Sequence, residues 1–362
     1  MKALDLSLPT TARVFSYVVT TGGFNHENDR IVSLSYRKSA AKLPTSGCVT
    51  GCLEVTLVTD ICPDDNAEVT VSCSNGFKLP KFYIASRSIP GAGLLKLVCY
   101  DRMMFADRDF DVSAYGEEED KKKTKTVLIS KVVSDIVTAC GFSGGGAVDV
   151  YGAETVTVDD IKGKSCREIL ELFSEGACGI WYCNVNNALT FLPLGATNTL
   201  VSSDIYSAVK AGSAKGPISR VVAENSSDGE EFDTLGGTGI GSIIRVESIF
   251  ASAENAAGIL SACSGFVFTA FKCSRALISS DMEIGCGVRL GDEEYICTNF
   301  MLNFTVKGIY AELSAPELSE SEYDYLNRLR RESKSSVKSG RTYKNVKISK
   351  YEGFSFVGRD SK

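Results

Sequence analysis

The chain has 362 residues, of which 44% are hydrophobic and 23% are charged, and its formal net charge is −6. Such a composition is typical of a folded protein with two or three domains, and it excludes an intrinsically disordered chain. No apolar stretch approaches the roughly 20 residues that cross a membrane, and Met1–Asp5 does not open a signal peptide. We therefore expect a protein that is made and folded in the cytoplasm, without stable membrane insertion.

The first hundred residues are predicted to form an antiparallel β-domain. The expected strands lie within Ala12–Thr20, Arg30–Tyr36, Gly47–Thr59, Glu68–Cys73, Phe77–Ser86 and Leu94–Tyr100. In the third of them Leu53, Val55 and Leu57 alternate with polar residues, so they share one face. Asn75–Gly76 is a strong signal for a hairpin turn. Short strands at this spacing are typical of a barrel or a sandwich.

Residues 106–200 change character and predict a small α+β insert. The run Glu117–Lys123 is strongly charged, and we expect it to lie in a solvated loop. Apolar residues then recur every three or four positions through Ile129–Cys140, which predicts an amphipathic helix. Gly141 supplies the stop for that helix.

The second part of the insert carries a clear helix start. Ser165 and Glu168 have the spacing of a capping box, so a helix is expected to begin at this point. Gly179–Cys183 and Ala188–Leu192 follow as strand-like segments around a turn. We expect this hairpin to pack on the two helices, with Trp181, the single tryptophan, in the core of the insert.

Residues 201–316 return to β-structure. The expected strands are Pro217–Val222, Ile240–Val246, Phe266–Leu277, Val288–Leu290, Glu294–Val306 and Ile309–Leu313. Between the first two, Ser227–Gly241 is expected to be a loop, because its glycines lack the Lys-Ser/Thr and the helix of a phosphate-binding loop. Ser252 is expected to cap a short helix that ends at Cys263. Gly291–Asp292 predicts a tight turn, and Gly308 a β-bulge.

The C-terminal segment is basic, whereas the rest of the chain is acidic. Residues 328–362 contain 11 Lys/Arg and 3 Asp/Glu, so the remainder holds 39 − 11 = 28 basic and 45 − 3 = 42 acidic residues. This asymmetry indicates self-association or a defined partner rather than sequence-specific nucleic-acid binding. A disordered tail is the open alternative to an arm that orders on a partner. The candidate partner-docking residues are Leu326, Arg328, Leu329, Arg330, Arg331, Tyr343, Tyr351, Phe354 and Phe356.

The thirteen cysteines do not form a recognisable metal or disulfide pattern. Three residues separate Cys48 from Cys52, four separate Cys178 from Cys183, and no CxxC occurs. Most cysteines lie in apolar runs, where the thiol acts as a small hydrophobic group. Buried reduced thiols are therefore the prediction, with disulfides or an all-thiolate metal site as the alternative.

No set of residues predicts catalysis, a cofactor or a metal site. His26 is the only histidine, and its turn-like surroundings suggest a surface loop rather than a general base. The acidic pairs Asp159–Asp160 and Glu293–Glu294 are expected in solvated turns, although a glycosidase pair stays open because carboxylate separation is invisible in sequence. We therefore expect a structural or binding protein rather than an enzyme.

Three segments together resemble a known family. They are the apolar strand that closes with Leu97–Arg102, the two-helix insert with its Trp181–Leu192 hairpin, and the closing strands of Val288–Glu317. Their order over residues 10–316 is similar to that of the baseplate hub (tail hub) family of phage tails and contractile injection systems. That family shares its fold with the N-terminal part of type VI secretion spike proteins.

The resemblance implies a fold class and an assembly. The fold would be α+β, mainly β, with two tube-protein-like antiparallel β-barrel domains at 1–105 and 201–316, an α+β insert at 106–200, and a basic helix and arm at 317–362. The assembly would be a homotrimeric ring that adapts a sixfold tail tube to a threefold spike.

The implied partners are a tail tube or tube-initiator protein, a central spike protein, other baseplate subunits and a tape-measure protein. The implied location is the virion tail or a tail-like particle that is assembled in the bacterial cytoplasm. A tail-tip protein that binds a receptor or a carbohydrate, and a tail-associated hydrolase, are the alternatives.

Overall fold

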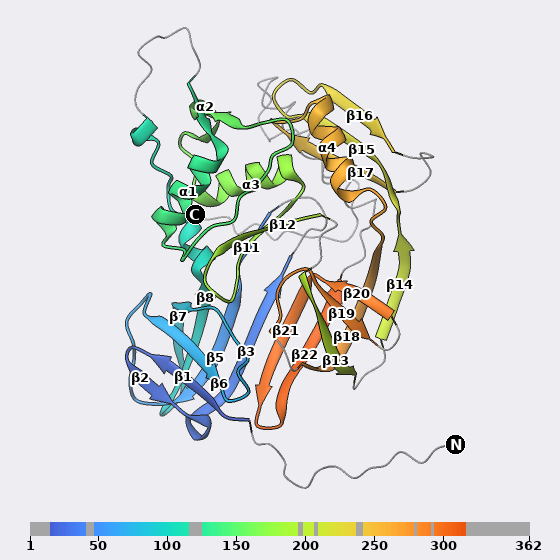
Figure 1. Ribbon diagram of the computed structural model, residues 1–362. Helices are drawn as coiled ribbons and strands as arrows, with labels where there is room; N and C mark the ends of the chain where they lie inside the picture. The colour runs from blue at the N-terminus through green and yellow to red at the C-terminus, as the bar shows by residue number, and fades with distance from the viewer. Residues whose placement is uncertain are drawn as a thin grey trace, which may run out of the picture. The chain divides into compact units, whose positions relative to one another are not determined.

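The computed structural model describes residues 15–40, 47–115, 125–194, 198–205, 209–236, 242–278, 281–290 and 293–315 (Figure 1). Within these ranges strands dominate, and they gather in one large sheet and three small ones, which confirms the predicted mainly-β class. None of the helices in the same ranges is long and apolar enough to cross a membrane.

The large sheet has 14 strands and takes seven from each β-rich region of the chain. The N-terminal strands are β1 (Tyr17–Thr21), β2 (Phe24–His26), β3 (Ile31–Ser39), β5 (Cys52–Val58), β6 (Glu68–Cys73), β7 (Phe82–Gly91) and β8 (Leu94–Asp101), with the short 3-10 helix η1 (Asn28–Arg30) before β3. The C-terminal strands are β13 (Asn198–Ile205), β14 (Val209–Lys215), β18 (Phe268–Ile278), β19 (Cys286–Leu290), β20 (Glu293–Cys297), β21 (Asn299–Thr305) and β22 (Gly308–Ala315).

The two halves of this sheet meet where β3 pairs antiparallel with β21, with Tyr36 opposite Leu302. The strand order is β2-β1-β6-β7-β8-β5-β3-β21-β22-β18-β13-β19-β20, and β14 also pairs with β18. Among the described residues this path is open, with β2 at one end and β20 at the other. Closure of each half into a barrel therefore stays a prediction.

The alternation of apolar and polar residues along the strands builds the core of the N-terminal half, as the sequence predicts. Leu53, Val55 and Leu57 on β5 are all 0% exposed, and so are Leu97 and Cys99 on the neighbouring β8. Because successive side chains of a strand point to opposite faces, these five residues line one side of the sheet. Each buried leucine stabilises the fold by about 1.5–3 kcal/mol relative to an exposed one.

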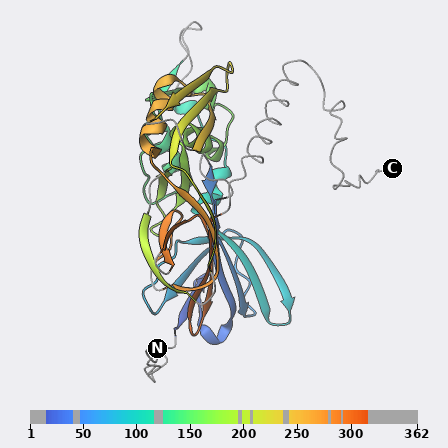
Figure 2. The same cartoon turned by 90° about the vertical axis from the view of Figure 1, so that its right-hand side faces the viewer.

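The N-terminal half is strongly twisted, and β1 returns to the far end of β21 (Figure 2). The backbone N–H of Phe15 donates a hydrogen bond to the carbonyl oxygen of Val306 at 3.1 Å. The hydroxyl of Tyr17 donates to the carbonyl oxygen of Thr305 at 2.8 Å. The ring of Tyr17 also meets that of Phe304 edge to face, with centroids 5.5 Å apart. The sheet therefore wraps around its own apolar side instead of lying flat.

The turn predicted at Asn75–Gly76 forms, but it does not join two fully paired strands. Gly76 has φ +79°, in the region that favours glycine. The chain then runs without regular structure until β7 begins at Phe82, so β7 pairs with β6 only at Glu68 and Val69. The prediction of a tight hairpin from the Asn-Gly signal is therefore wrong.

Two predictions in the C-terminal half also need correction. The long strand expected at Glu294–Val306 is broken at Thr298 into β20 and β21, which an unbroken apolar pattern does not reveal. Gly308, expected at a bulge, instead begins β22 opposite Thr305, directly after the turn that joins β21 to β22. Its φ is +141°, and an added Cβ would lie 2.7 Å from Cδ1 of Leu277, so both conformation and space require glycine.

The insert contains both predicted helices and the predicted hairpin. Its elements are η2 (Arg102–Asp107), η3 (Ser113–Tyr115), β9 (Thr126–Leu128), α1 (Ile129–Cys140), β10 (Thr155–Thr157), α2 (Val158–Ile161), α3 (Cys166–Ala177), β11 (Gly179–Cys183) and β12 (Leu189–Pro193). Both hydrogen bonds of the capping box at Ser165 and Glu168 are present, and Gly141 ends α1 in the left-handed conformation. Trp181 is 0% exposed in the core of the insert, as predicted.

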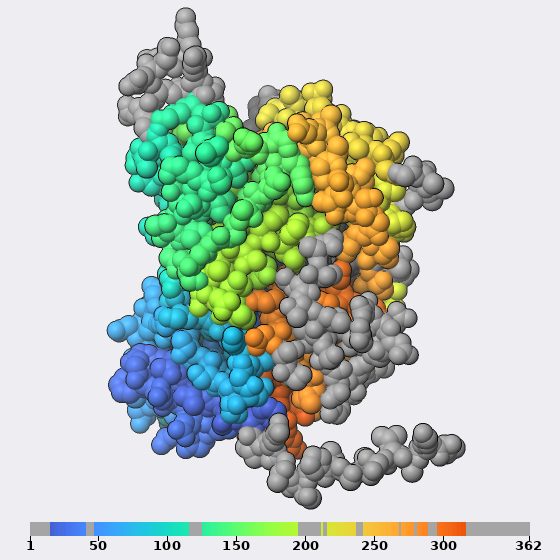
Figure 3. Space-filling view, in the orientation of Figure 1, coloured from blue at the N-terminus to red at the C-terminus, as the bar shows by residue number. Residues whose placement is uncertain are grey.

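One strand of the N-terminal region completes the insert. β4 (Cys48–Val49) pairs parallel with β11, with Cys48 opposite Trp181. In the space-filling view the insert, in teal and green, lies against the blue N-terminal half and the orange α4 (Ala253–Cys263) (Figure 3). The insert is therefore joined to both of the regions that flank it in the chain.

The strands predicted around residue 230 form a separate small sheet. β15 (Ile218–Asn225) lies between β16 (Glu231–Leu235) and β17 (Ser242–Ser248), and α4 covers one face. Since β16 lies inside Ser227–Gly241, the prediction of a simple loop there is wrong. The segment has few apolar residues and only one aromatic residue, Phe232, so its strand signal is weak. Ser252 caps α4, as predicted.

Candidate functional site

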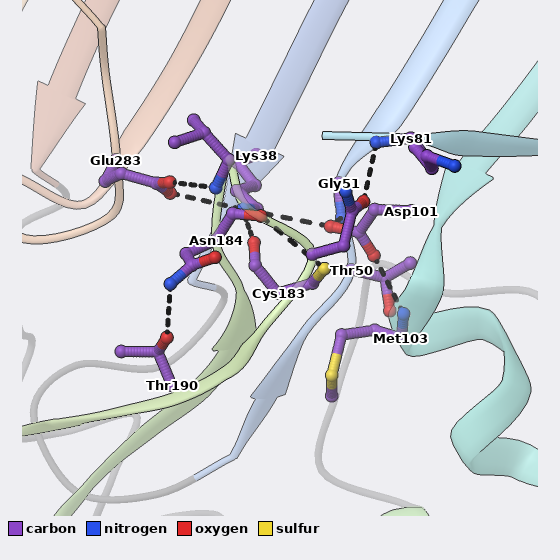
Figure 4. A network of polar contacts seen from close by, with 12 residues as sticks. Lys38, Thr50, Gly51, Lys81, Asp101, Met103, Cys183, Asn184, Thr190 and Glu283 are labelled. Atoms are coloured by element: carbon purple, nitrogen blue, oxygen red, sulfur yellow. Dashed lines mark hydrogen bonds and ion pairs between the residues drawn. The ribbon is translucent and has the colours of Figure 1, made fainter. Parts of the chain in front are cut away.

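A buried polar cluster lies where the two halves of the large sheet and the insert meet (Figure 4). The ammonium of Lys38 on β3 donates a hydrogen bond to the carbonyl oxygen of Cys183 at the end of β11. It lies 3.4 Å from Oε2 of Glu283, which precedes β19, and 3.8 Å from Oδ2 of Asp101 at the end of β8. We call Lys38, Asp101, Cys183 and Glu283 the Lys38 network.

The strand register explains why a lysine is buried at this position. Leu34, Tyr36 and Lys38 occupy alternate positions of β3, so they share the face that points to the core. The side chain of Lys38 is 0% exposed, and its ammonium lies 5.0 Å from the ring centroid of Tyr182. A buried ammonium is stable only when polar partners replace water, and this network supplies them.

Asp101 is held by two backbone donors besides Lys38. Its Oδ2 accepts a hydrogen bond from the N–H of Gly51 at 2.8 Å, and its Oδ1 accepts from the N–H of Met103 at 3.1 Å. The second bond caps η2, where the chain enters the insert. A Cβ on Gly51 would lie 2.7 Å from Oδ2 of Asp101 and 2.9 Å from the ring of Tyr36, so only glycine allows this close approach.

The two central groups of the network, Lys38 and Asp101, carry opposite charges, and burial disfavours the charged form of each. Burial raises the pKa of Asp101 to about 6, although Lys38 and the two backbone N–H groups act to lower it. Burial acts to lower the pKa of Lys38, but Tyr36, Glu283 and Asp101 together outweigh it and hold this pKa well above its ordinary value. At neutral pH both the ammonium and the carboxylate are therefore charged.

Glu283 connects the C-terminal half to the insert. While Oε2 faces Lys38, Oε1 accepts a hydrogen bond from the backbone N–H of Val185 at 2.7 Å, in the turn between β11 and β12. One carboxylate thus contacts β3 and the insert at the same time. The Lys38 network therefore ties together three regions that are far apart in the sequence.

A second set of contacts, near η2, also holds the insert to the N-terminal half of the sheet. The guanidinium of Arg167 on α3 donates to the carbonyl oxygen of Met103 at 2.8 Å and to Oγ1 of Thr50 at 3.2 Å, and it pairs with Asp107. The guanidinium of Arg102 packs on the ring of Tyr83, 4.3 Å from its centroid. The entry to the insert is therefore fixed by two arginines.

The chemistry of the Lys38 network favours a structural role. A lysine beside two carboxylates could in principle transfer protons, but Lys38 and Asp101 are both 0% exposed and both have protein partners. Groups that are this deeply buried and paired act mainly on the rigidity of the joint.

The position of the single histidine differs from the predicted one. His26 ends β2 and is only 5% exposed, so the prediction of a surface loop is wrong. Burial, followed by the nearby Arg30, lowers its pKa. The side chain is drawn inward because β2 pairs with β1, where Val19 lies opposite His26.

The predicted burial of the cysteines is confirmed for ten of the thirteen, and all thirteen are free thiols. Cys48 and Cys73 are partly buried, and Cys62 is exposed. Within the described residues no group of three or more His, Cys, Asp or Glu side chains could hold a metal ion.

The residues predicted to dock a partner lie outside the described residues. They are Leu326, Arg328, Leu329, Arg330, Arg331, Tyr343, Tyr351, Phe354 and Phe356. The charged run Glu117–Lys123 and the turn Gly291–Asp292 also fall outside, so their assignments stay predictions.

Two solved structures share the fold over nearly their whole length. The 43 kDa tail protein of prophage MuSo2 from Shewanella oneidensis has a TM-score of 0.54 at 13% identity, over 83% of this chain and 98% of that one. Prophage tail protein gp18 from Listeria monocytogenes EGD-e has a TM-score of 0.52 at 12% identity, over 87% and 98%. This chain has the fold of prophage tail proteins. No protein-family model and no curated protein matches it.

The tail-protein fold confirms the resemblance to the phage-tail family at the level of structure. Asp101, which lies in one of the segments that carry the resemblance, is central to the Lys38 network. Lys38 and Glu283 were not predicted from the sequence. A signal for Lys38 was present, because it continues the alternation of Leu34 and Tyr36, whereas nothing in the polar segment around Glu283 marks it as a partner.

Proposed function

We propose that the chain is a structural hub of a phage tail or tail-like particle, and that it forms a homotrimeric ring between a sixfold tail tube and a threefold spike. The observation that carries the proposal is the tail-protein fold over 83% and 87% of the chain. The two groups of seven strands support it, because three copies of the chain would present six such groups. The ring would thus match a sixfold partner on one face and keep threefold symmetry on the other.

In this proposal the regions take the roles that the sequence suggests. Residues 1–105 and 201–316 are the two tube-like units, 106–200 is the insert, and 317–362 is a docking arm. The ends of the described strand path, β2 and β20, are candidates for pairing between neighbouring copies, since unpaired strand edges attract further strands. Such pairing would complete the barrel-like units in the assembled ring.

The Lys38 network supports the role of a rigid adaptor. It fixes the two halves of the sheet and the insert to one another by charged hydrogen bonds in a buried joint. A subunit held between a tube and a spike has to keep its two halves in a fixed position relative to each other. The proposed partners are the tail tube or its initiator, the spike, other baseplate subunits and the tape-measure protein, within a virion tail assembled in the bacterial cytoplasm.

The mass of the full-length protein in solution tests the ring. Light scattering after size-exclusion chromatography should give about three times 38.9 kDa, either for the chain alone or after mixing with a candidate spike protein. A second measurement, electron microscopy of the same fraction, should show particles with threefold symmetry. A chain that stays monomeric in both samples would contradict the proposal.

Deletion of residues 328–362 tests the arm. The removed segment carries a net charge of +8, from 11 Lys/Arg and 3 Asp/Glu, and most of the candidate docking residues. We expect the shortened chain to keep its circular-dichroism spectrum and melting temperature but to give no assembled particles in a complementation assay. Exchange of the eleven basic residues for glutamine in the full-length chain is the matched control for charge alone. Normal particle yield from the shortened chain would show that the arm is dispensable.

A further inference from the structure

A short segment of the C-terminal half of the large sheet reaches both of the other regions of the chain. Residues 281–285 directly precede β19 and belong to no helix or strand. Met282 and Ile284 are 2% and 0% exposed, whereas Asp281 and Glu283, which alternate with them, are only partly buried. We call residues 281–285 the strap.

The two carboxylates of the strap hold two separate elements of the N-terminal half. Oδ1 of Asp281 accepts a hydrogen bond at 2.7 Å from the backbone N–H of Lys78, which lies in the irregular chain between β6 and β7. Oε2 of Glu283 lies 3.4 Å from the ammonium of Lys38 on β3 (Figure 4). Hydrogen bonds that involve a charged group are stronger than those between neutral groups, so both contacts hold the strap in place.

The strap also contacts the β-hairpin of the insert. Oε1 of Glu283 accepts a hydrogen bond at 2.7 Å from the backbone N–H of Val185, in the turn between β11 and β12. A Cβ on Gly285 would lie 2.1 Å from Cδ2 of Leu192 on β12, so the backbone of the strap packs against this leucine. The strap therefore contacts both the turn and one strand of the hairpin.

The turn of the hairpin in its turn holds the N-terminal half. Oδ1 of Asn187 accepts a hydrogen bond at 2.7 Å from the backbone N–H of Lys81, three residues after Lys78. The carbonyl oxygen of Asn187 accepts from the N–H of Ser143 at 3.0 Å, so the turn is also fixed within the insert. The strap, the turn and the segment Lys78–Lys81 therefore each contact the other two.

The burial of Met282 couples the two carboxylates of the strap. Met282 lies between Asp281 and Glu283 in the chain, so a backbone shift that withdraws one carboxylate also displaces the other. The same shift would bring a buried apolar side chain into water, which favours the closed position. Because the strap has no regular secondary structure, its opening costs less free energy than unfolding of the sheet.

We propose that the strap opens and closes as one unit, and that it switches the joint of the three regions between a rigid and an open state. In the open state Lys38 is accessible to water, and Lys78 and Val185 lose their acceptors together. Gly285 is the hinge, because its φ is +76° and its N–H is anchored to the carbonyl oxygen of Cys297 at the end of β20, at 2.8 Å. This inference does not depend on the proposed function, since all of these contacts lie within one chain.

Amide hydrogen exchange of the full-length protein, resolved to single residues by mass spectrometry, tests the proposal. In the wild-type protein the amides of Lys78 and Val185 should have the same opening constant within about threefold, and should open more often than the core amides of β5 and β8. A larger difference between Lys78 and Val185 would overturn the proposal. Opening no more frequent than that of the core would also overturn it, because the strap would then open only with the whole fold.

The variant Asp281→Ala distinguishes a strap that moves as one unit from two independent contacts. Asp281 accepts from Lys78, whereas Val185 donates to Glu283. We expect exchange to become about tenfold faster at both Lys78 and Val185, the effect of losing one hydrogen bond to a charged group. Faster exchange at Lys78 alone would show that the contacts are independent and would overturn the proposal.

Asp111→Ala is the matched control for the loss of such a bond. Oδ1 of Asp111 accepts a hydrogen bond from the backbone N–H of Ser113 at 2.8 Å, within the insert. This variant should leave the exchange of Lys78 and Val185 unchanged. An equal acceleration in the control would assign the effect to general destabilisation and count against the strap.

Discussion

Replacing Lys38 by methionine should lower the free energy of unfolding by about 3–5 kcal/mol, because it leaves Asp101 and Glu283 without their shared cation in a buried joint. Methionine keeps most of the length and volume of the side chain, so the loss reports the charge rather than a cavity. Urea unfolding followed by circular dichroism measures the difference.

The neighbouring residue gives a matched control for this prediction. Arg37 follows Tyr36 on the same strand, but its side chain is 58% exposed and pairs with Glu54 at 3.4 Å on the surface. Exposed ion pairs contribute about 0.2–1 kcal/mol, so Arg37→Met should cost less than about 1 kcal/mol. Similar losses for the two variants would contradict the role of the Lys38 network.

The pH dependence of the same variant has a definite sign. Burial raises the pKa of Asp101 from its ordinary 3.8 to about 6, so the folded protein holds this proton more tightly than the unfolded chain. Its stabilising contribution is therefore complete below about pH 4 and is lost as the pH rises to about 6. Without Lys38 the pKa of Asp101 should rise further, and the loss should extend above pH 6. The stability gap between Lys38→Met and wild type should then widen from pH 6 to 8, and a constant gap would refute this account.

Replacing Trp181 by alanine should destabilise the insert by about 3–5 kcal/mol, the cost of emptying a fully buried aromatic site. Trp181 packs against Phe191, with ring centroids 4.9 Å apart, inside the core that joins α1 and α3. Calorimetry measures the effect as a lower melting temperature.

Trp181→Phe is the matched variant. Among the described residues the indole Nε1 has no hydrogen-bond partner, so phenylalanine removes an unsatisfied donor while it keeps an aromatic ring in place. The cost should stay below about 2 kcal/mol. A loss as large as that of Trp181→Ala would indicate that the indole nitrogen has a partner in solution.

Local patterns predicted much of this fold. The alternation of Leu53, Val55 and Leu57 located a core face, and the capping box of Ser165 and Glu168 located the start of α3. These features depend on residues close together in the chain, where strand and helix periods act directly. The same reasoning failed at β16, because Glu231–Leu235 is mostly polar and forms an edge strand that pairs only with β15, so it has no apolar face to reveal it.

The long-range part of the fold could not be predicted from such patterns. Nothing in β3 indicates that its neighbour is β21, and nothing in Lys38 indicates that Glu283 lies 3.4 Å away. Both depend on how two distant halves pack, which a periodic pattern does not encode. The order of elements did point to the correct fold, because order is a property of the whole chain.

The pairing of β3 with β21 has a consequence for synthesis of the chain. Tyr36 leaves the ribosome 302 − 36 = 266 residues before its partner Leu302, a delay of roughly 13–50 seconds at ordinary elongation rates of about 5–20 residues per second. During this time β3 can pair with β5, but its other edge has no native partner. The pairing between the two halves of the sheet can therefore form only after β21 has been synthesised, and a translation product interrupted before that point would carry an open strand edge on β3.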